Sequence, residues 1–91
     1  MTPAEIMWRE DEASRELGIR LEETRPGYAR MSMRVKRSMA NAQKMCHGGF
    51  IFMLADSAFG FACNTHNQRS VSASCSIDYL APAFVEEHLT A

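Results

Sequence analysis

The sequence has little net charge, few cysteines and no long apolar run, and each of these shortages excludes a class of protein. Ten basic and eleven acidic residues among 91 give a net charge of −1, which argues against nucleic-acid binding through a basic surface. Three cysteines, an odd number, do not indicate a disulfide framework and favour a reducing compartment. We therefore expect a cytoplasmic protein that does not bind nucleic acid.

The sequence also lacks a segment that predicts membrane insertion. Its most apolar run, residues 50–63, is too short to span a bilayer and contains an aspartate. Residues 1–12 are acidic and have no apolar core of the kind that a secretory signal requires. We expect a single domain, residues 1–91, that has no membrane partner and gains stability by oligomerising.

Local patterns predict a helix and a hairpin in the first part of the chain. Residues 2–5 have the form of a capping box, which predicts a helix that runs to about Leu17 and stops at Gly18. Alternating apolar residues predict strands over 19–24 and 30–36, joined by a turn that contains Pro followed by Gly. The apolar face of the second strand consists of Met31, Met33 and Val35.

The second part of the chain predicts a buried helix and more sheet. After a loop over residues 37–47, a helix from Gly48 to about Cys63 is apolar nearly all round, and such a helix is covered on every side. Alternation predicts another strand over 70–80, and residues 88–91 resemble the start of a further one. Three strands cannot cover both sides of the helix, so more sheet or a partner has to supply the rest.

Asp56 is the most informative residue, because it is the one charged group inside the apolar run. A carboxylate in such a segment is costly unless it is paired, hydrogen-bonded or protonated. Just upstream, His47, Gly48 and Gly49 offer a helix start whose free backbone N–H groups can bind an anion or polarise a carbonyl. A buried carboxylate and an open helix N-terminus are two parts of a hydrolytic site.

The spacing of these two parts predicts a dimer. Asp56 follows Gly48 by eight residues, which is about 12 Å along a helix axis. One reacting carbonyl cannot contact both groups of the same helix, because a hydrogen bond needs roughly 3 Å. Two antiparallel copies of the helix across a two-fold axis would bring Gly48 of one copy opposite Asp56 of the other.

The chemistry that this arrangement predicts is acyl transfer to water. The Gly48 N–H would hold the developing oxyanion, and Asp56 would act as general base on water or attack the carbonyl itself. Asn41 could orient the water or the substrate, or could be an ordinary turn residue. His47 could assist polarisation or form a structural hydrogen bond in the loop. The cysteines and histidines match no zinc-binding spacing, so we expect no metal and no cofactor.

The same residues carry a resemblance to a known family. Asn41, then His47-Gly48-Gly49, then Asp56 at these spacings, together with Ser-Ile-Asp-Tyr-Leu-Ala-Pro-Ala at 76–83, resemble the hotdog-fold acyl-CoA thioesterases. The PaaI-type branch, which acts in phenylacetate degradation, is the most similar. The resemblance implies an α+β hotdog fold, in which an antiparallel sheet wraps around a long buried central helix.

The resemblance also implies an activity, partners and residue roles. It implies hydrolysis of acyl-CoA thioesters of the phenylacetyl or hydroxyphenylacetyl type, in a homodimer or homotetramer with sites at the subunit interface. Asp56 matches the family's catalytic carboxylate and Gly48 its oxyanion donor. Supporting polar residues and substrate-binding positions would be Asn41, His47, Gly49 and Ser72.

One departure from the family leaves a second function open. The family's domain continues for several further strands, so the chain resembles about its N-terminal two-thirds. The alternative is therefore a catalytically inactive, truncated hotdog domain that binds acyl-CoA or a partner subunit.

Overall fold

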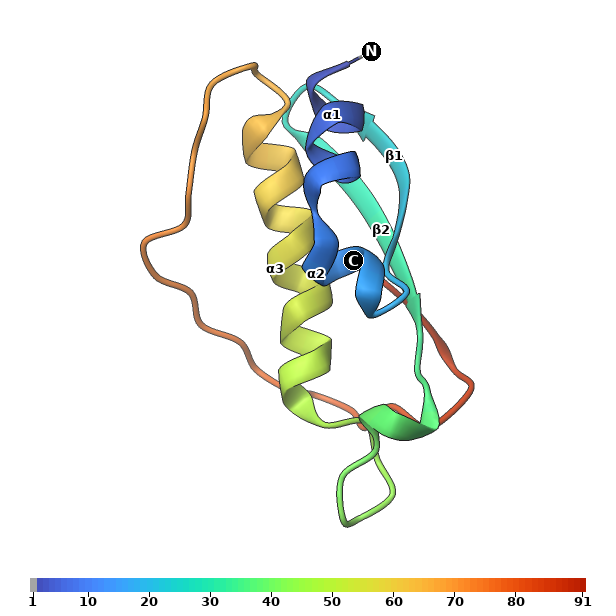
Figure 1. Cartoon of the computed structure of the whole chain (residues 1–91). Coiled ribbons are helices and arrows are strands. Elements are labelled where there is room, and N and C mark those ends of the chain that lie inside the picture. The colour runs from blue at the N-terminus through green and yellow to red at the C-terminus, as the bar shows by residue number, and fades with distance from the viewer. Residues whose placement is uncertain (1) are drawn as a thin grey trace.

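The computed structural model describes residues 2–91 and shows a three-stranded antiparallel sheet packed against one long helix (Figure 1). The strands lie in the order β1-β2-β3. In chain order the elements are α1 (Pro3–Glu10), α2 (Glu12–Glu16), β1 (Arg20–Arg25), β2 (Tyr28–Arg34), the 3₁₀ turn η1 (Arg37–Met39), α3 (Gly48–Asn64) and β3 (His88–Thr90).

The N-terminal helix begins as predicted but ends earlier. The Thr2 hydroxyl accepts the Glu5 N–H at 3.1 Å and the Glu5 carboxylate accepts the Thr2 N–H at 3.3 Å, which completes the capping box. The prediction of one helix as far as Leu17 is wrong, because the chain breaks at Asp11. The Asp11 side chain accepts the Ser14 N–H at 3.0 Å and so caps a second helix, α2.

The hairpin confirms the prediction from alternation. Strands β1 and β2 pair antiparallel around Gly27, whose φ of 72° is the left-handed conformation that this turn requires. Met31, Met33 and Val35 are buried and form the inner face of the sheet. Strand β3 pairs with the other edge of β2, with Met33 opposite Leu89. The expected strand start near residue 88 is therefore confirmed.

The strand predicted over residues 70–80 is wrong. In the structure this segment has no strand partner and runs back alongside α3, on the side away from the sheet (Figure 1, orange). Val71 is 92% exposed and Leu80 is 94% exposed. The physical reason is that a strand needs a neighbour for its backbone groups, and this segment lies across α3 from the sheet, where no described strand is within reach (Figure 1).

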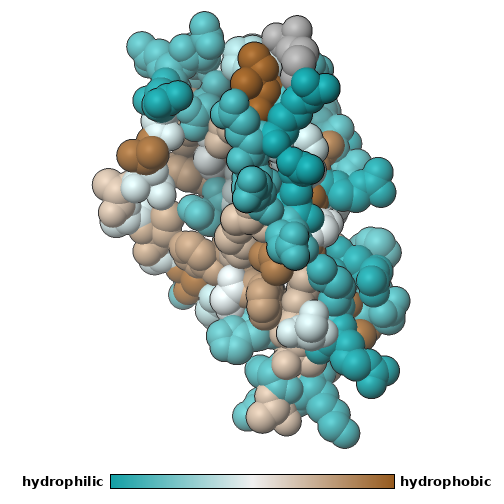
Figure 2. All heavy atoms as spheres, in the orientation of Figure 1, coloured by the Kyte–Doolittle hydropathy of each residue, from teal (hydrophilic) through white to brown (hydrophobic). Residues whose placement is uncertain are grey.

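Helix α3 confirms the predicted bounds within one residue, but this chain covers only one side of it. Its buried residues are Leu54, Ser57, Ala58 and Phe61. On the other side Ala55 is exposed and Phe59 is 49% exposed, which agrees with the expectation that three strands cannot cover both sides of the helix. Figure 2 shows apolar surface over α3 and the segment beside it. Within residues 2–91, no helix is long and apolar enough to cross a bilayer.

We predict that the three thiols differ in reactivity in the folded protein. Cys46 is buried, and this burial raises the pKa of its thiol. A raised pKa lowers the thiolate fraction near pH 8, so iodoacetamide should alkylate Cys46 at least about tenfold more slowly than the exposed Cys75. Peptide mapping by mass spectrometry measures both rates, and unfolding in urea should equalise them. Equal rates in the folded protein would contradict the packing around Cys46.

Candidate functional site

His47 shapes the start of α3. It is the N-cap residue, and its Nδ1 accepts the Gly49 N–H at 3.0 Å. Its carbonyl accepts the Phe50 N–H at 3.0 Å, and its own N–H donates to the Met39 carbonyl at 2.7 Å. The structural role that the sequence left open for His47 is therefore present, since the side chain satisfies one donor of the first turn.

The Gly48 N–H is the donor that remains available at this helix start. It has no acceptor among residues 2–91, whereas the N–H groups of Gly49 and Phe50 both bond to His47. An unsatisfied N–H at the first helical position, at the positive end of the helix dipole, can bind an oxyanion. Gly49 offers no comparable free donor, and its role in substrate binding stays a prediction.

Asp56 lies on α3 with its carboxylate unengaged. It makes no hydrogen bond or ion pair with the part of the chain that the structure describes. The side chain is half-buried, so the expectation of a fully buried carboxylate is wrong for one chain. The reason is that Ala55 and Phe59 beside it face outward, on the side of α3 that the sheet does not cover.

Gly48 and Asp56 belong to one open stripe of α3. At about 100° per residue, the five residues of this stripe fall within about one-third of the helix circumference, opposite the four buried residues. The members of the stripe are Gly48, Phe52, Ala55, Asp56 and Phe59. The two candidate groups thus face the same way but lie about 12 Å apart along the axis, too far for one carbonyl to contact both.

Asn41 organises the loop that leads into the helix. Its Oδ1 accepts the backbone N–H groups of Gln43 at 2.9 Å and Met45 at 3.1 Å. The turn role that the sequence left open for Asn41 is therefore present, and this carboxamide oxygen is committed to the loop. The Asn41 NH₂ group has no acceptor within residues 2–91, so any contact of the side chain with substrate would use this donor.

Tyr79 is a site residue that the sequence did not single out. Its hydroxyl donates to the Gly48 carbonyl at 3.0 Å. A Cβ atom at Gly48 would lie 2.9 Å from the Tyr79 ring, so any other residue at this position would displace the exposed ring. The sequence did contain one signal that could have identified Tyr79, namely its position in the segment 76–83, which carries part of the family resemblance. Ser72, four residues before this segment, is exposed and has no bond to the site among the described residues.

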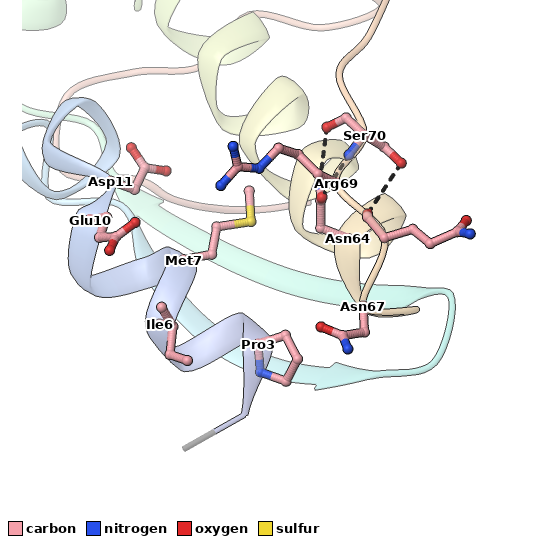
Figure 3. Close-up of a pocket in the computed structure, with 10 residues that line it drawn as sticks. Pro3, Ile6, Met7, Glu10, Asp11, Asn64, Asn67, Arg69 and Ser70 are labelled. Atoms are coloured by element: carbon pink, nitrogen blue, oxygen red, sulfur yellow. Dashed lines mark hydrogen bonds between the residues drawn. The ribbon is translucent and has the colours of Figure 1, made fainter.

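A separate hollow lies at the other end of α3. It measures about 750 Å³ and is bounded by α1 and by the turn after α3, where Asn64, Asn67 and Arg69 face Ile6 and Met7 (Figure 3). Its lining includes neither Gly48 nor Asp56. In the described residues, no three His, Cys, Asp or Glu side chains are grouped to hold a metal ion. A single chain therefore presents the two candidate groups on an open face, outside this hollow.

Comparisons with known proteins identify the family. Residues 43–91 match the model of the thioesterase superfamily. The acyl-coenzyme A thioesterase PaaI of Escherichia coli K12 is 40% identical over 88 residues, which are 97% of this chain and 63% of that protein. This chain thus spans less than two-thirds of that relative.

Solved structures agree with the family match. The Escherichia coli PaaI structure superposes with a TM-score of 0.95 at 39% identity, over 97% of this chain and 64% of that one. A mutant of the PaaI protein of Thermus thermophilus has a TM-score of 0.84 and 32% identity, over 88% of this chain and 69% of that one. A hypothetical thioesterase protein of Streptococcus pneumoniae with coenzyme A has a TM-score of 0.74 and 28% identity, over 79% of this chain and 58% of that one. The predicted hotdog architecture is confirmed, and the chain belongs to the thioesterase superfamily.

Proposed function

We propose that this protein hydrolyses acyl-CoA thioesters to a free acid and coenzyme A, with Gly48 as oxyanion donor and Asp56 as general base or nucleophile. One observation carries the proposal: an unsatisfied helix N-terminal N–H and an unpartnered carboxylate occur on the same open stripe of an apolar helix. Both groups are free to engage a ligand, because nothing in residues 2–91 occupies them.

In this mechanism the thioester carbonyl oxygen accepts the Gly48 N–H. As water or the Asp56 carboxylate attacks the carbonyl carbon, the oxygen gains charge, and a fixed donor stabilises that charge. With Asp56 as base, the attacking water loses its proton to the carboxylate while the carbon–oxygen bond forms. The carbon–sulfur bond then breaks, and the proton reaches the leaving thiolate to give coenzyme A.

The active unit in this proposal is a homodimer, alone or within a homotetramer. The two groups lie about 12 Å apart on one helix, so each site takes Gly48 from one copy and Asp56 from a second, antiparallel copy. The uncovered stripe supports this arrangement, because Ala55 and Phe59 lie on the same face as Asp56 and need apolar cover.

The substrate class rests on the relatives. The Escherichia coli relative is an acyl-coenzyme A thioesterase, and the Thermus relative is a phenylacetic acid degradation protein. The Streptococcus structure contains coenzyme A. We therefore propose phenylacetyl-CoA or hydroxyphenylacetyl-CoA as the substrate, with Asn41, His47, Gly49 and Ser72 as supporting polar and substrate-binding residues.

A second candidate function is a domain that binds acyl-CoA or a partner subunit without turnover. The observation in its favour is that the chain spans 63% of the Escherichia coli relative and its three-stranded sheet covers one side of α3. One assay distinguishes the two candidate functions. Hydrolysis of phenylacetyl-CoA, followed with a thiol-trapping reagent, should be compared between residues 1–91 and a chimera that adds the unmatched part of that relative.

Asp56→Asn should lower kcat at least about 100-fold in whichever of these two proteins is active, because the amide can neither accept a proton nor attack the carbonyl. The same thiol-trapping assay on phenylacetyl-CoA measures the loss. Asp78→Asn is the matched control, since it removes an exposed carboxylate outside the open stripe. Parent-like turnover by Asp56→Asn would assign the residue a structural role.

Gly48→Pro should lower kcat by about 10²–10³-fold relative to Gly48→Ala, the loss typical of one missing oxyanion donor. Both variants place a Cβ against Tyr79, but only proline removes the N–H. Proline is tolerated at the first helical position, and His47 already has φ −59° and ψ 133°, which suit a residue before proline. Equal kcat values for the two variants would exclude the Gly48 N–H as the donor.

Co-expression of Asp56→Asn with Gly48→Pro should restore activity to two inactive variants. In a mixed dimer, one of the two sites combines an intact Gly48 with an intact Asp56, so random assembly should recover about a quarter of the parent rate. Differently tagged subunits, purified through both tags, enrich the mixed dimer. If the doubly purified dimer is as inactive as each variant alone, each site is built within one copy or from other residues.

A further inference from the structure

A buried pair of hydroxyls lies next to the proposed catalytic carboxylate. Ser57 directly follows Asp56, and its Oγ is 2.8 Å from the Oγ of Ser14 in α2. Ser14 is 1% exposed and Ser57 is 9% exposed. The Ser14 N–H is in turn held by the Asp11 side chain at 3.0 Å. The hydroxyl pair thus joins α3 to a capped and fixed helix start.

The apolar contacts of α3 do not by themselves select one rotation of the helix about its axis. Leu54, Ala58 and Phe61 pack on the buried face, but apolar contacts have no preferred direction, so a rotation of a few degrees changes them only gradually. A buried hydroxyl that loses its partner keeps its full desolvation penalty with nothing to offset it. The Ser14–Ser57 hydrogen bond therefore penalises rotations that the apolar contacts would tolerate.

A small rotation of α3 would displace the Asp56 carboxylate. Side-chain ends lie about 5–6 Å from a helix axis, so a turn of about 10° moves them by about 1 Å. A displacement of about 1 Å at a reacting group can lower the rate about 100-fold. Because Ser57 and Asp56 are adjacent, about 100° apart on the helix, fixing the direction of one side chain fixes the direction of the other.

We propose that Ser14 and Ser57 are positioning residues, whose hydrogen bond sets the rotation of α3 and thereby aims Asp56 at the thioester. This inference rests on the proposed function of Asp56. Neither serine faces the open stripe, so neither would contact the substrate. Their effect should appear in kcat, while KM stays within about twofold, because uniform substrate binding is unchanged.

Three variants test the pair in the protein that shows activity in the Asp56 comparison. Ser14→Ala and Ser57→Ala each leave one buried hydroxyl unpaired, and each should lower kcat about tenfold or more and lower the urea midpoint. The double variant Ser14→Ala/Ser57→Ala removes both polar groups, so its urea midpoint should return close to that of the parent. Its kcat should stay low, because the rotation is no longer fixed.

Ser32→Ala is the matched control, since the Ser32 hydroxyl donates to Glu22 on the exposed side of the sheet at 2.6 Å, and it should keep the parent kcat. If a single variant fails to fold, the double variant still distinguishes a positioning role of the two serines from a purely structural one. Recovery of kcat together with stability would mean a purely structural pair and would overturn the inference.

The test separates this inference from the proposed function. If the parent is active and Asp56→Asn is not, but all three serine variants keep the parent kcat, the function stands and the positioning role is wrong. If the folded parent and its chimera both lack thioesterase activity, the proposed function is wrong and the positioning role falls with it.

Discussion

The apolar circumference of α3 constrains the rest of this structure. The sheet and the two short N-terminal helices cover the side that carries Leu54 and Phe61, while the opposite side remains open. That open side also carries Gly48 and Asp56. In the proposed dimer, the approach of a second helix would both cover the exposed apolar surface and assemble the catalytic site. A fold that covered α3 completely would leave neither group accessible to a thioester.

Local chemistry explains which parts of the fold were predictable. The capping box at Thr2, the glycine turn of the hairpin and the start of α3 depend on neighbours a few residues away, and all three are confirmed. Asp11 shows the limit, because a side chain that can cap a helix can also divide one. Residues 70–80 have the alternation that is typical of a strand, but a local pattern cannot indicate whether a neighbouring strand is available for pairing.

The candidate site also combines features that local sequence predicts with features that depend on tertiary packing. A free N–H at Gly48 follows from a glycine at a helix start, and the sequence was sufficient to indicate it. Tyr79 and the Ser14–Ser57 pair are contacts between residues 31 and 43 positions apart, and no local pattern encodes them. The partial exposure of Asp56 is equally a property of packing, because an apolar sequence does not reveal which side of its helix the sheet will cover.

The position of β2 between β1 and β3 has a consequence for the order of folding. The β1–β2 hairpin can form as soon as it is synthesised, since its strands are adjacent in sequence. Strand β3 pairs with the other edge of β2 only after residues 35–87 have been translated. Throughout that interval β2 presents an unpaired edge backed by Met31 and Met33, the kind of surface that recruits other chains. The nascent protein should depend on chaperones most strongly in this interval.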